Sequence, residues 1–326
     1  MRPALLRRVI MGLIDLMVVA PVRRVKLLRR GLAYVESRLR VPDPPHALLR
    51  GHASYCWLPG HDVQYNARYY AAMRTLFLGD DRMPRIDRER RATIVERFER
   101  IDADVDIKTS PVEGLLLAEA VLSLQNPGDL VECGCYAGGS TAKLSVLAGL
   151  TGRRLLAFDS FEGLPAPMPN EVRDLHLRRG ENAPHDWAVG EYCGPLETVR
   201  ATVEAFGDLA SCTFVKGWFR DTLEARLPDC VAFAFVDVDL ASSAVECLRH
   251  LWPRMPERGV LFSHDIAYLK VLEALTDPHF WQDLLYEPPP IFFGAGFGLG
   301  DAAAHLGFAV KGRFDPEYIK SLTLNK

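Results

Sequence analysis

Two short polar motifs, each directly after an apolar run, carry side chains that can activate a hydroxyl group. Asp237 and Asp239 follow one run, and His264 and Asp265 follow another. Carboxylate oxygens suit Mg²⁺, whereas an imidazole ligand shifts the preference toward manganese, iron, zinc or no metal, and histidine can also act as a general base. The motifs therefore predict either metal-assisted or metal-free base catalysis, with Asp237, Asp239 and His264 as catalytic residues.

A glycine-rich stretch earlier in the chain predicts a ligand-binding turn between a strand and a helix. Residues 129–143 begin as an apolar run and continue into glycines that let a ligand approach the backbone. A dinucleotide site favours G-x-G-x-x-G, whereas here Glu132 lies two positions before the first glycine. A carboxylate at this place can pair with the ammonium group of S-adenosyl-L-methionine. The predicted cofactor residues of this stretch are Glu132, Gly134, Tyr136, Gly138, Gly139, Ser140 and Thr141.

Further cofactor residues are predicted after the next apolar runs. Asp159 can hold ribose hydroxyls, and Ser160 and Phe161 follow it directly. Gly217 permits close approach, and Trp218 is predicted to pack beside the adenine, with a place in the core as the alternative. Asp237 completes the predicted cofactor set.

Alternating strands and helices are expected to position these residues. Short apolar runs separated by helical patterns are typical of a parallel sheet with helices on both faces, and ligands bind beyond the carboxyl ends of its strands. The alternative to a catalytic role for Asp237 or Asp239 is a structural one, in which the carboxylate caps a helix near Ser242. The seven predicted strands, one of the last two antiparallel, are the apolar run that opens residues 129–143 and the runs at residues 154–158, 212–216, 231–236, 259–263, 291–293 and 307–311.

Two further segments outside the predicted strands have recognisable sequence patterns. Ser110 and Glu113 form a capping box that opens a helix over residues 115–124. The polar stretch after Pro165, which contains residues 185–187, is interpreted as an acceptor lid or as a solvated surface loop.

The charge is nearly balanced overall but uneven along the chain. The 326 residues include 39 basic and 42 acidic ones, a net charge of −3, which gives no reason to expect a nucleic acid partner. Residues 1–40 hold ten basic and two acidic residues, a net +8, which leaves 29 basic and 40 acidic residues, a net −11, in the rest. The first 40 residues are therefore a basic arm.

The apolar run in this basic arm is too short to form a helix that crosses a membrane. The apolar run at residues 9–20 is interrupted by Asp15, and a helical face follows between basic residues. Such a helix either packs on its own protein or lies on an anionic membrane surface. Seven cysteines without C-x-x-C spacing suggest reduced thiols, so we expect a cytoplasmic protein, with peripheral contact at the inner face of the membrane if the arm binds lipid.

The sequence resembles the macrocin O-methyltransferase (TylF-type) family of class I, S-adenosylmethionine-dependent methyltransferases. The matching motifs are Leu130-Val-Glu-Cys-Gly-Cys-Tyr-Ala-Gly-Gly-Ser140, Phe158-Asp-Ser-Phe-Glu-Gly-Leu-Pro165, Lys216-Gly-Trp-Phe-Arg-Asp-Thr-Leu223 and Asp237-Val-Asp-Leu-Ala-Ser-Ser243. The resemblance implies a Rossmann-like fold and methyl transfer to a sugar hydroxyl. It also implies a magnesium site at the first acid of Asp-x-Asp and two adjacent acids after the next strand, which here predicts Asp237, His264 and Asp265 as the metal ligands. This sequence has His264 and Asp265 where the family has two aspartates, and Ala241 where a tyrosine is usual.

Together these features predict an N-terminal arm and proline-rich linker (residues 1–45), a helical cap or lid segment (46–109) and a methyltransferase domain (110–326). The expected partner is a glycan or another small-molecule acceptor, and a homo-oligomer is a further expectation. A non-catalytic S-adenosylmethionine-binding module and an NAD-linked oxidoreductase are the alternatives, because fold alone does not choose among them.

Overall fold

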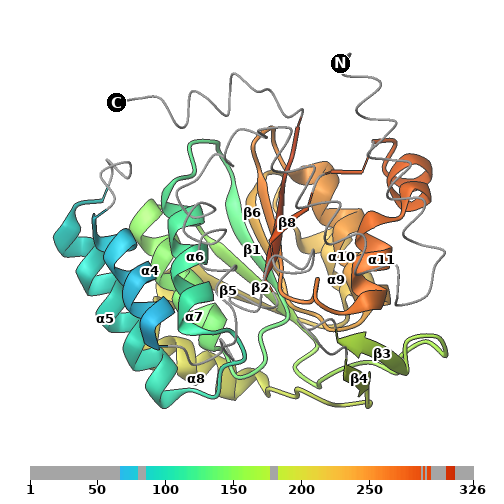
Figure 1. Ribbon diagram of the computed structural model, residues 1–326, viewed down its shortest axis with the longest axis horizontal. Helices are drawn as coiled ribbons and strands as arrows, with labels where there is room; N and C mark the ends of the chain where they lie inside the picture. The colour runs from blue at the N-terminus through green and yellow to red at the C-terminus, as the bar shows by residue number, and fades with distance from the viewer. Residues whose placement is uncertain are drawn as a thin grey trace. The chain divides into compact units, whose positions relative to one another are not determined.

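The computed structural model describes residues 67–79, 86–176, 183–287, 289–290, 292–294 and 306–312 (Figure 1). All of them belong to one compact unit. The basic arm and linker predicted over residues 1–45 lie outside the described residues. Of the predicted cap segment, residues 67–79 and 86–109 are described.

The core is a seven-stranded sheet. Its strands are β1 (Asp129–Cys133), β2 (Leu155–Asp159), β5 (Cys212–Lys216), β6 (Val231–Val236), β7 (Val260–Ser263), β8 (Phe293–Gly294) and β9 (Gly307–Val310). Their order is β5-β2-β1-β6-β7-β9-β8. The first five strands in this order are parallel, and β9 is antiparallel to both neighbours. This topology confirms the predicted mostly parallel sheet.

Helices cover both faces of the sheet (Figure 1). One face carries α4 (Ala67–Gly79), α5 (Arg88–Asp104), α6 (Pro111–Leu122), α7 (Gly139–Thr151) and α8 (Leu196–Phe206). The other face carries α9 (Phe219–Arg226), α10 (Ala241–Arg254) and α11 (Leu269–Thr276). Helices α4 and α5 pack against α6, so this part of the predicted cap segment adds to the core of the domain.

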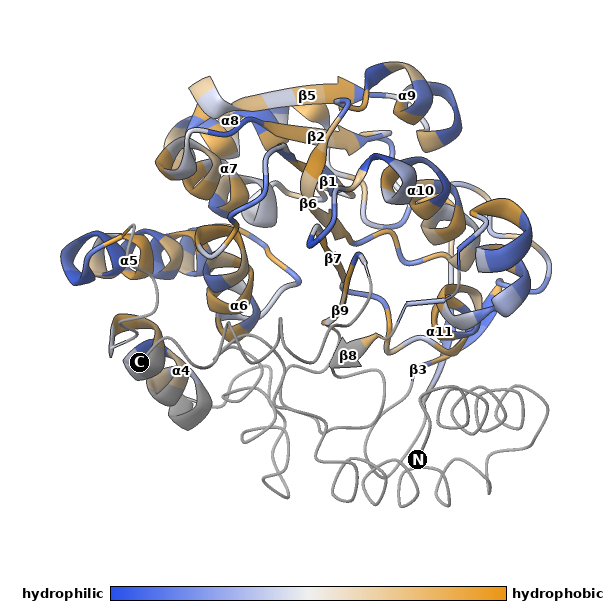
Figure 2. Cartoon of the chain, turned by 90° about the horizontal axis from the view of Figure 1, so that it is seen from above, coloured by the Kyte–Doolittle hydropathy of each residue, from blue (hydrophilic) through white to orange (hydrophobic). Residues whose placement is uncertain are grey.

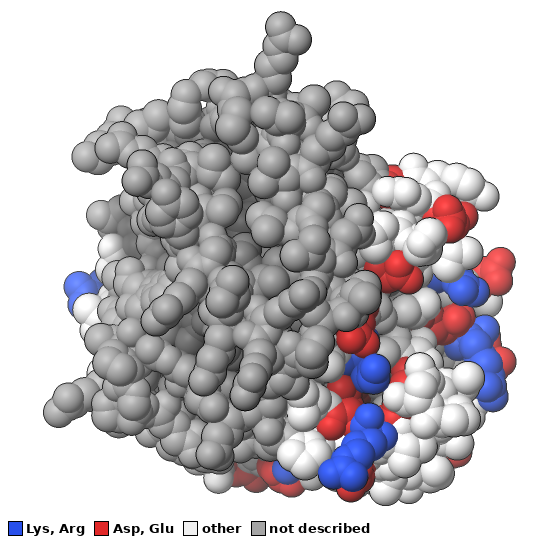
Figure 3. Space-filling model, turned by 45° about the vertical axis from the view of Figure 1, so that its right-hand side comes forward, with Lys and Arg blue, Asp and Glu red and all other residues white. Residues whose placement is uncertain are grey.

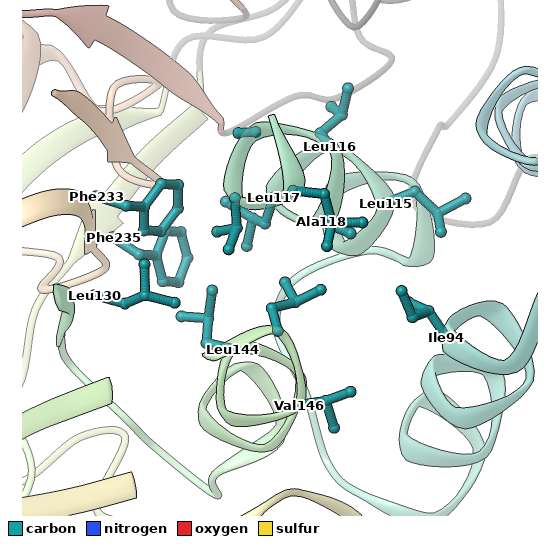
Figure 4. Close-up of a cluster of buried hydrophobic side chains, with 14 of the residues drawn as sticks. Ile94, Leu115, Leu116, Leu117, Ala118, Leu130, Leu144, Val146, Phe233 and Phe235 are labelled. Carbon is teal, nitrogen blue, oxygen red and sulfur yellow. The ribbon is translucent and has the colours of Figure 1, made fainter. Parts of the chain in front are cut away.

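The two faces are sorted by the alternation of side chains along each strand. Leu130 and Phe233 belong to the cluster under α6 and α7, whereas Val131 belongs to the cluster under α10. Figure 4 shows Leu130, Phe233 and Phe235 directed toward α6 and α7. The central strands are hydrophobic along their length (Figure 2). Each such side chain contributes about 1.5–3 kcal/mol when fully buried, so this packing holds the strand ends in place.

The capping box at the start of α6 is confirmed. The hydroxyl of Ser110 accepts a hydrogen bond from the amide of Glu113 at 3.3 Å, and the carboxylate of Glu113 accepts one from the amide of Ser110 at 2.7 Å. Glu113 is 2% exposed, so the box is buried inside the domain.

Part of the polar stretch after Pro165 forms two paired strands, so the alternative of a solvated surface loop is wrong there, whereas a role as an acceptor lid stays a prediction. Strands β3 (Arg173–His176) and β4 (Ala183–Asp186) pair antiparallel as a separate two-stranded sheet. The carboxylate of Asp174 accepts a hydrogen bond from the amide of Lys270 at 3.1 Å, which docks the hairpin on α11. This tertiary contact compensates for the weak strand propensity of the charged residues.

Charges of both signs are interspersed over the described part of the face in Figure 3. This mixture fits the nearly balanced composition and offers no single-sign field for a polyanion. None of the described helices has the length and the apolar character needed to cross a membrane.

Candidate active site

The carboxyl ends of four parallel strands bring the predicted site residues to one edge of the sheet. The amides of Gly134, Asp237 and His264 each donate to a carbonyl at the end of the neighbouring strand at 2.9 Å. The residues that follow β1, β6 and β7 therefore lie in one row, and Asp159 ends β2 beside them. This arrangement places the predicted cofactor residues and the predicted acid cluster at the same edge, as expected for an open α/β sheet.

The glycines of the turn after β1 are required by packing within the protein. A Cβ atom on Gly134 would lie 1.8 Å from the carbonyl oxygen of Asp237, and Gly134 has a φ of +91°. Gly138, with a φ of +85°, lies against Val199, and Gly139 lies against the loop before α6. The sequence assigns these glycines to ligand approach alone, and the structure adds this second cause. The turn leads into α7 at the predicted place.

Glu132 is the most deeply buried acid of the site, with 0% exposure. Among the described residues, neither of its carboxylate oxygens has a hydrogen-bond partner. Burial raises the pKa of Glu132 to about 8, the nearby hydroxyls of Ser140 and Thr141 lower it in part, and Asp237 and Asp159 raise it further. The hydroxyls of Ser140 and Thr141 compensate the burial of this carboxylate only in part, so the residue is suited to receive a further donor.

Asp159 ties the turns after β1 and β2 together. One carboxylate oxygen accepts from the amide of Cys135 at 2.7 Å, and the other accepts from the amide of Phe161 at 2.6 Å. The hydroxyl of Ser160 lies 3.5 Å from the second oxygen. Burial raises the pKa of Asp159, and the hydrogen bonds oppose this rise. The carboxylate is thus oriented by the main chain, and its contact with ribose hydroxyls stays a prediction.

Backbone strain collects at three of these strand ends. Tyr136, Phe161 and Asp239 have φ values of 45°, 57° and 61°. Such left-handed residues cost about 1–3 kcal/mol each, and they cluster at functional sites. The hydroxyl of Tyr136 donates to Asp106, and its ring packs edge-on against Tyr192 with centroids 5.7 Å apart. The predicted cofactor residue Tyr136 is therefore held from two sides.

The acid cluster after β6 and β7 has the geometry of a cation site. The ligand atoms of Asp237, His264 and Asp265 all lie within 4.8 Å of one another. Nδ1 of His264 is 3.3 Å from Oδ1 of Asp237, and Nε2 is 3.5 Å from Oε2 of Glu113. One oxygen of Asp265 accepts two main-chain amides from the loop after β6, at 2.7 and 2.8 Å. The structure thus brings together the three predicted metal ligands.

The electrostatics of this cluster reflect several carboxylates in a confined space. Burial, reinforced by Asp237, raises the pKa of Asp265 to about 7, and burial and Asp265 raise the pKa of Asp239. Burial by itself lowers the pKa of His264, but Asp237 and Glu113 raise it, and the net direction is upward. A divalent cation would relieve this repulsion, so the chemistry of the donor set fits a metal.

The acids after β6 do not cap the following helix, so that alternative for Asp237 and Asp239 is wrong. Helix α10 begins after Leu240. The amide and the hydroxyl of Ser242 instead donate to Glu171, at 2.5 and 2.8 Å. Asp237 and Asp239 are therefore available for chemistry.

The predicted residues after β5 lie farther out on the sheet. The amide of Gly217 donates to the carbonyl of Asp159 at 2.9 Å, which fixes this turn next to β2. Trp218 is half-buried at the start of α9, so it is not a residue of the core. Its predicted contact with adenine stays a prediction.

Aromatic side chains that the sequence analysis missed flank the acid cluster. Tyr268 packs against Trp187 and His176, with ring centroids 4.8 Å apart in both pairs. The acids raise the pKa of Tyr268, after burial as the largest cause, and burial and Asp239 raise the pKa of Tyr192 to about 12. Only the short distance from His264 in the sequence could have pointed to Tyr268, and no sequence signal pointed to Tyr192.

The strand order, the glycine turn after β1 and the acids at the ends of β2 and β6 define a Rossmann-like methyltransferase fold. The chain belongs to the macrocin O-methyltransferase (TylF) family, whose sequence profile matches residues 115–283, more than half of its length. This match confirms the resemblance inferred from the motifs.

Two curated relatives and one solved structure illustrate the likeness. The chain is 36% identical to the 8-demethyl-8-(2,3-dimethoxy-alpha-L-rhamnosyl)-tetracenomycin-C 4'-O-methyltransferase of Streptomyces olivaceus over 163 residues. These aligned residues make up 49% of this chain and 60% of the relative. It is 29% identical over 154 residues to the demethyldecarbamoylnovobiocin O-methyltransferase of Streptomyces niveus, and the aligned residues make up 45% of this chain and 56% of that relative. The O-methyltransferase NovP superposes with a TM-score of 0.44 at 18% identity, over 76% of this chain and 99% of that one. The match therefore spans less than two thirds of each curated relative.

Proposed function

We propose that the protein is an S-adenosylmethionine-dependent O-methyltransferase that methylates a sugar hydroxyl of a glycosylated small molecule. The observation that carries this proposal is the position of the cluster of Asp237, His264 and Asp265 at the same sheet edge as Glu132. Membership of the macrocin O-methyltransferase family supports the reaction. The rhamnosyl group in the name of one relative supports a sugar as the acceptor.

The residues at the ends of β1 and β2 fit the proposed cofactor. The buried carboxylate oxygens of Glu132 lack a partner among the described residues, and an ammonium group would supply the missing donors. Asp159, fixed by two amides, can accept from ribose hydroxyls with its remaining lone pairs. S-adenosylmethionine, when bound, supplies an electrophilic methyl group.

The acid cluster fits a divalent cation and a general base. Asp237, His264 and Asp265 would hold the ion, which lowers the pKa of an acceptor hydroxyl. Asp239, whose pKa burial raises, would accept the hydroxyl proton, while transfer of the methyl group would break the sulfonium C–S bond and leave S-adenosylhomocysteine. Both ring nitrogens of His264 face carboxylates, so neither is directed at an acceptor hydroxyl, and this geometry disfavours a base role.

The aromatic residues beside the cluster support a sugar acceptor. The apolar C–H faces of a sugar ring pack on aromatic rings, while its hydroxyls reach adjacent carboxylates. Tyr192 and Tyr268 both pack against the cluster that contains Leu240, the residue after Asp239, and the amide of Tyr268 donates to the carbonyl of Asp265 at 2.9 Å, so the rings lie beside the acids. The hairpin that carries Trp187 is therefore the proposed wall of the acceptor site.

Transfer of a labelled methyl group from S-adenosylmethionine to rhamnosylated small molecules tests this function. We expect one methyl ether on a sugar hydroxyl, and we expect exhaustive chelation or Asp237→Asn to lower the rate by about 10²–10⁴-fold. Cofactor binding without transfer to any acceptor would instead support a non-catalytic module. Full transfer after chelation would remove the metal from the proposal.

A further inference from the structure

Glu113 has a second contact that its capping role does not require. Its Oε2 atom accepts the amide of Ser110 at 2.7 Å and lies 3.5 Å from Nε2 of His264. Both side chains are buried, with 3% and 8% exposure. The start of α6 is thereby connected to the end of β7, although capping needs only the bond to Ser110.

The imidazole of His264 is fixed from three directions. Glu113 faces Nε2, Asp237 faces Nδ1 at 3.3 Å, and the ring of Phe235 packs edge-on with centroids 6.3 Å apart. A neutral ring whose Nε2–H points toward one carboxylate can offer its Nδ1 lone pair to a cation that lies between Nδ1 and the carboxylates on the other side. That side is where Asp237 and Asp265 converge.

We propose that Glu113 is a positioning residue that holds His264 with Nε2–H toward α6 and presents Nδ1 to a divalent ion shared with Asp237 and Asp265. This inference rests on the metal site of the proposed function. It assigns Nδ1 as the ligand atom of His264, the residue that departs from the family's pattern. A carboxylate behind a ligating histidine orients the ring and increases its basicity, and loss of such a partner costs about 10–100-fold in metal affinity.

Two variants separate the proposed role of Glu113 from its capping role. Glu113→Gln keeps an acceptor for the amide of Ser110 but removes the charge behind His264, because glutamine also completes a capping box. Ser110→Ala removes the capping hydroxyl but leaves the carboxylate in place. Titration of the full chain with Mn²⁺ should show affinity about 10–100-fold weaker for Glu113→Gln and within about twofold of the parent for Ser110→Ala. The melting temperature should fall more for Ser110→Ala.

A double-mutant cycle gives a readout that a purely structural role would not produce. His264→Asp keeps an oxygen ligand near the position of Nδ1, but its side chain is too short to reach Glu113. Adding Glu113→Gln should therefore change Mn²⁺ affinity by less than about threefold in the His264→Asp background, although it weakens binding about 10–100-fold in the parent. An equal loss of affinity in both backgrounds would contradict the proposal.

Failure of this inference and failure of the proposed function give different results. If the parent binds Mn²⁺ and Glu113→Gln binds it equally well, the positioning role is wrong and the metal site stands. If the parent binds no Mn²⁺, both the positioning role and the metal are wrong, whereas binding of S-adenosylhomocysteine still reports on the methyltransferase site.

Discussion

Glu132 is a fully buried carboxylate under α7, and its environment makes ionisation costly without a ligand. Its pKa of about 8 lies well above the ordinary value of 4.5, with burial as the largest cause. The folded chain therefore keeps a proton on Glu132 between pH 4.5 and 8, while the unfolded chain has lost it. Stability is accordingly lost as the pH rises through this window.

Glu132→Gln should remove this pH-dependent loss of stability. The amide cannot ionise, so the free energy of unfolding of the variant, relative to that of the parent, should increase by a few kcal/mol from pH 5.5 to pH 8.5. Urea unfolding at both pH values measures the difference. Glu204→Gln, at an exposed position of α8, controls for the removal of one charge. An identical advantage at both pH values would show that the burial argument is wrong.

The sequence indicates which residues reach the site but not how each one is paired. The acids at Asp237, Asp159 and Asp265 could be predicted because each follows an apolar strand. Their partners could not, because Asp159 and Asp265 are oriented by main-chain amides of other turns. The contact of Glu113 with His264 joins segments far apart in the sequence.

At the scale of elements, the glycine turn joins β1 to β6 as closely as a backbone allows. A side chain at Gly134 would collide with the carbonyl of Asp237, whereas Gly152 at the end of α7 has a φ of +66° and no described atom within 4 Å of an added Cβ. An alanine at Gly134 would therefore meet both a steric collision and a strained backbone, whereas an alanine at Gly152 would meet only the strained backbone.

Gly134→Ala should destabilise the protein far more than Gly152→Ala. We expect a loss of about 3 kcal/mol or more at Gly134, where the strand ends must separate, and about 1–2 kcal/mol at Gly152, where only the left-handed conformation is penalised. Urea unfolding gives both values. Equal losses would mean that the close approach of β1 and β6 is not as described.

The elements that could be predicted are those whose sequence carries its own signal. Continuous apolar runs predict β5 and β6 with the bounds that they have in the structure, and the capping box predicts the start of α6. The hairpin β3–β4 could not be predicted, because its short charged strands depend on docking against α11. Its contact with Tyr268 was missed for the same reason, although residues 185–187 were singled out.

At the scale of the whole molecule, we propose that one sheet edge binds S-adenosylmethionine at β1 and β2 and activates an acceptor at β6 and β7. The basic arm at residues 1–40 lies outside the described residues, so its contact with a membrane stays a prediction. The division into three segments likewise stays a prediction, although the match over residues 115–283 assigns the central part to a methyltransferase family.

Calorimetric titration with S-adenosylhomocysteine, with NAD in parallel, tests this claim most directly. We predict that the full chain binds S-adenosylhomocysteine and not NAD, and that Glu132→Ala and Asp159→Ala each weaken binding by about 1–3 kcal/mol because a charged partner is lost. Glu204→Ala on α8 should bind as the parent does. Binding of NAD, or unchanged affinity in both acid variants, would contradict the assignment of this edge as the cofactor site.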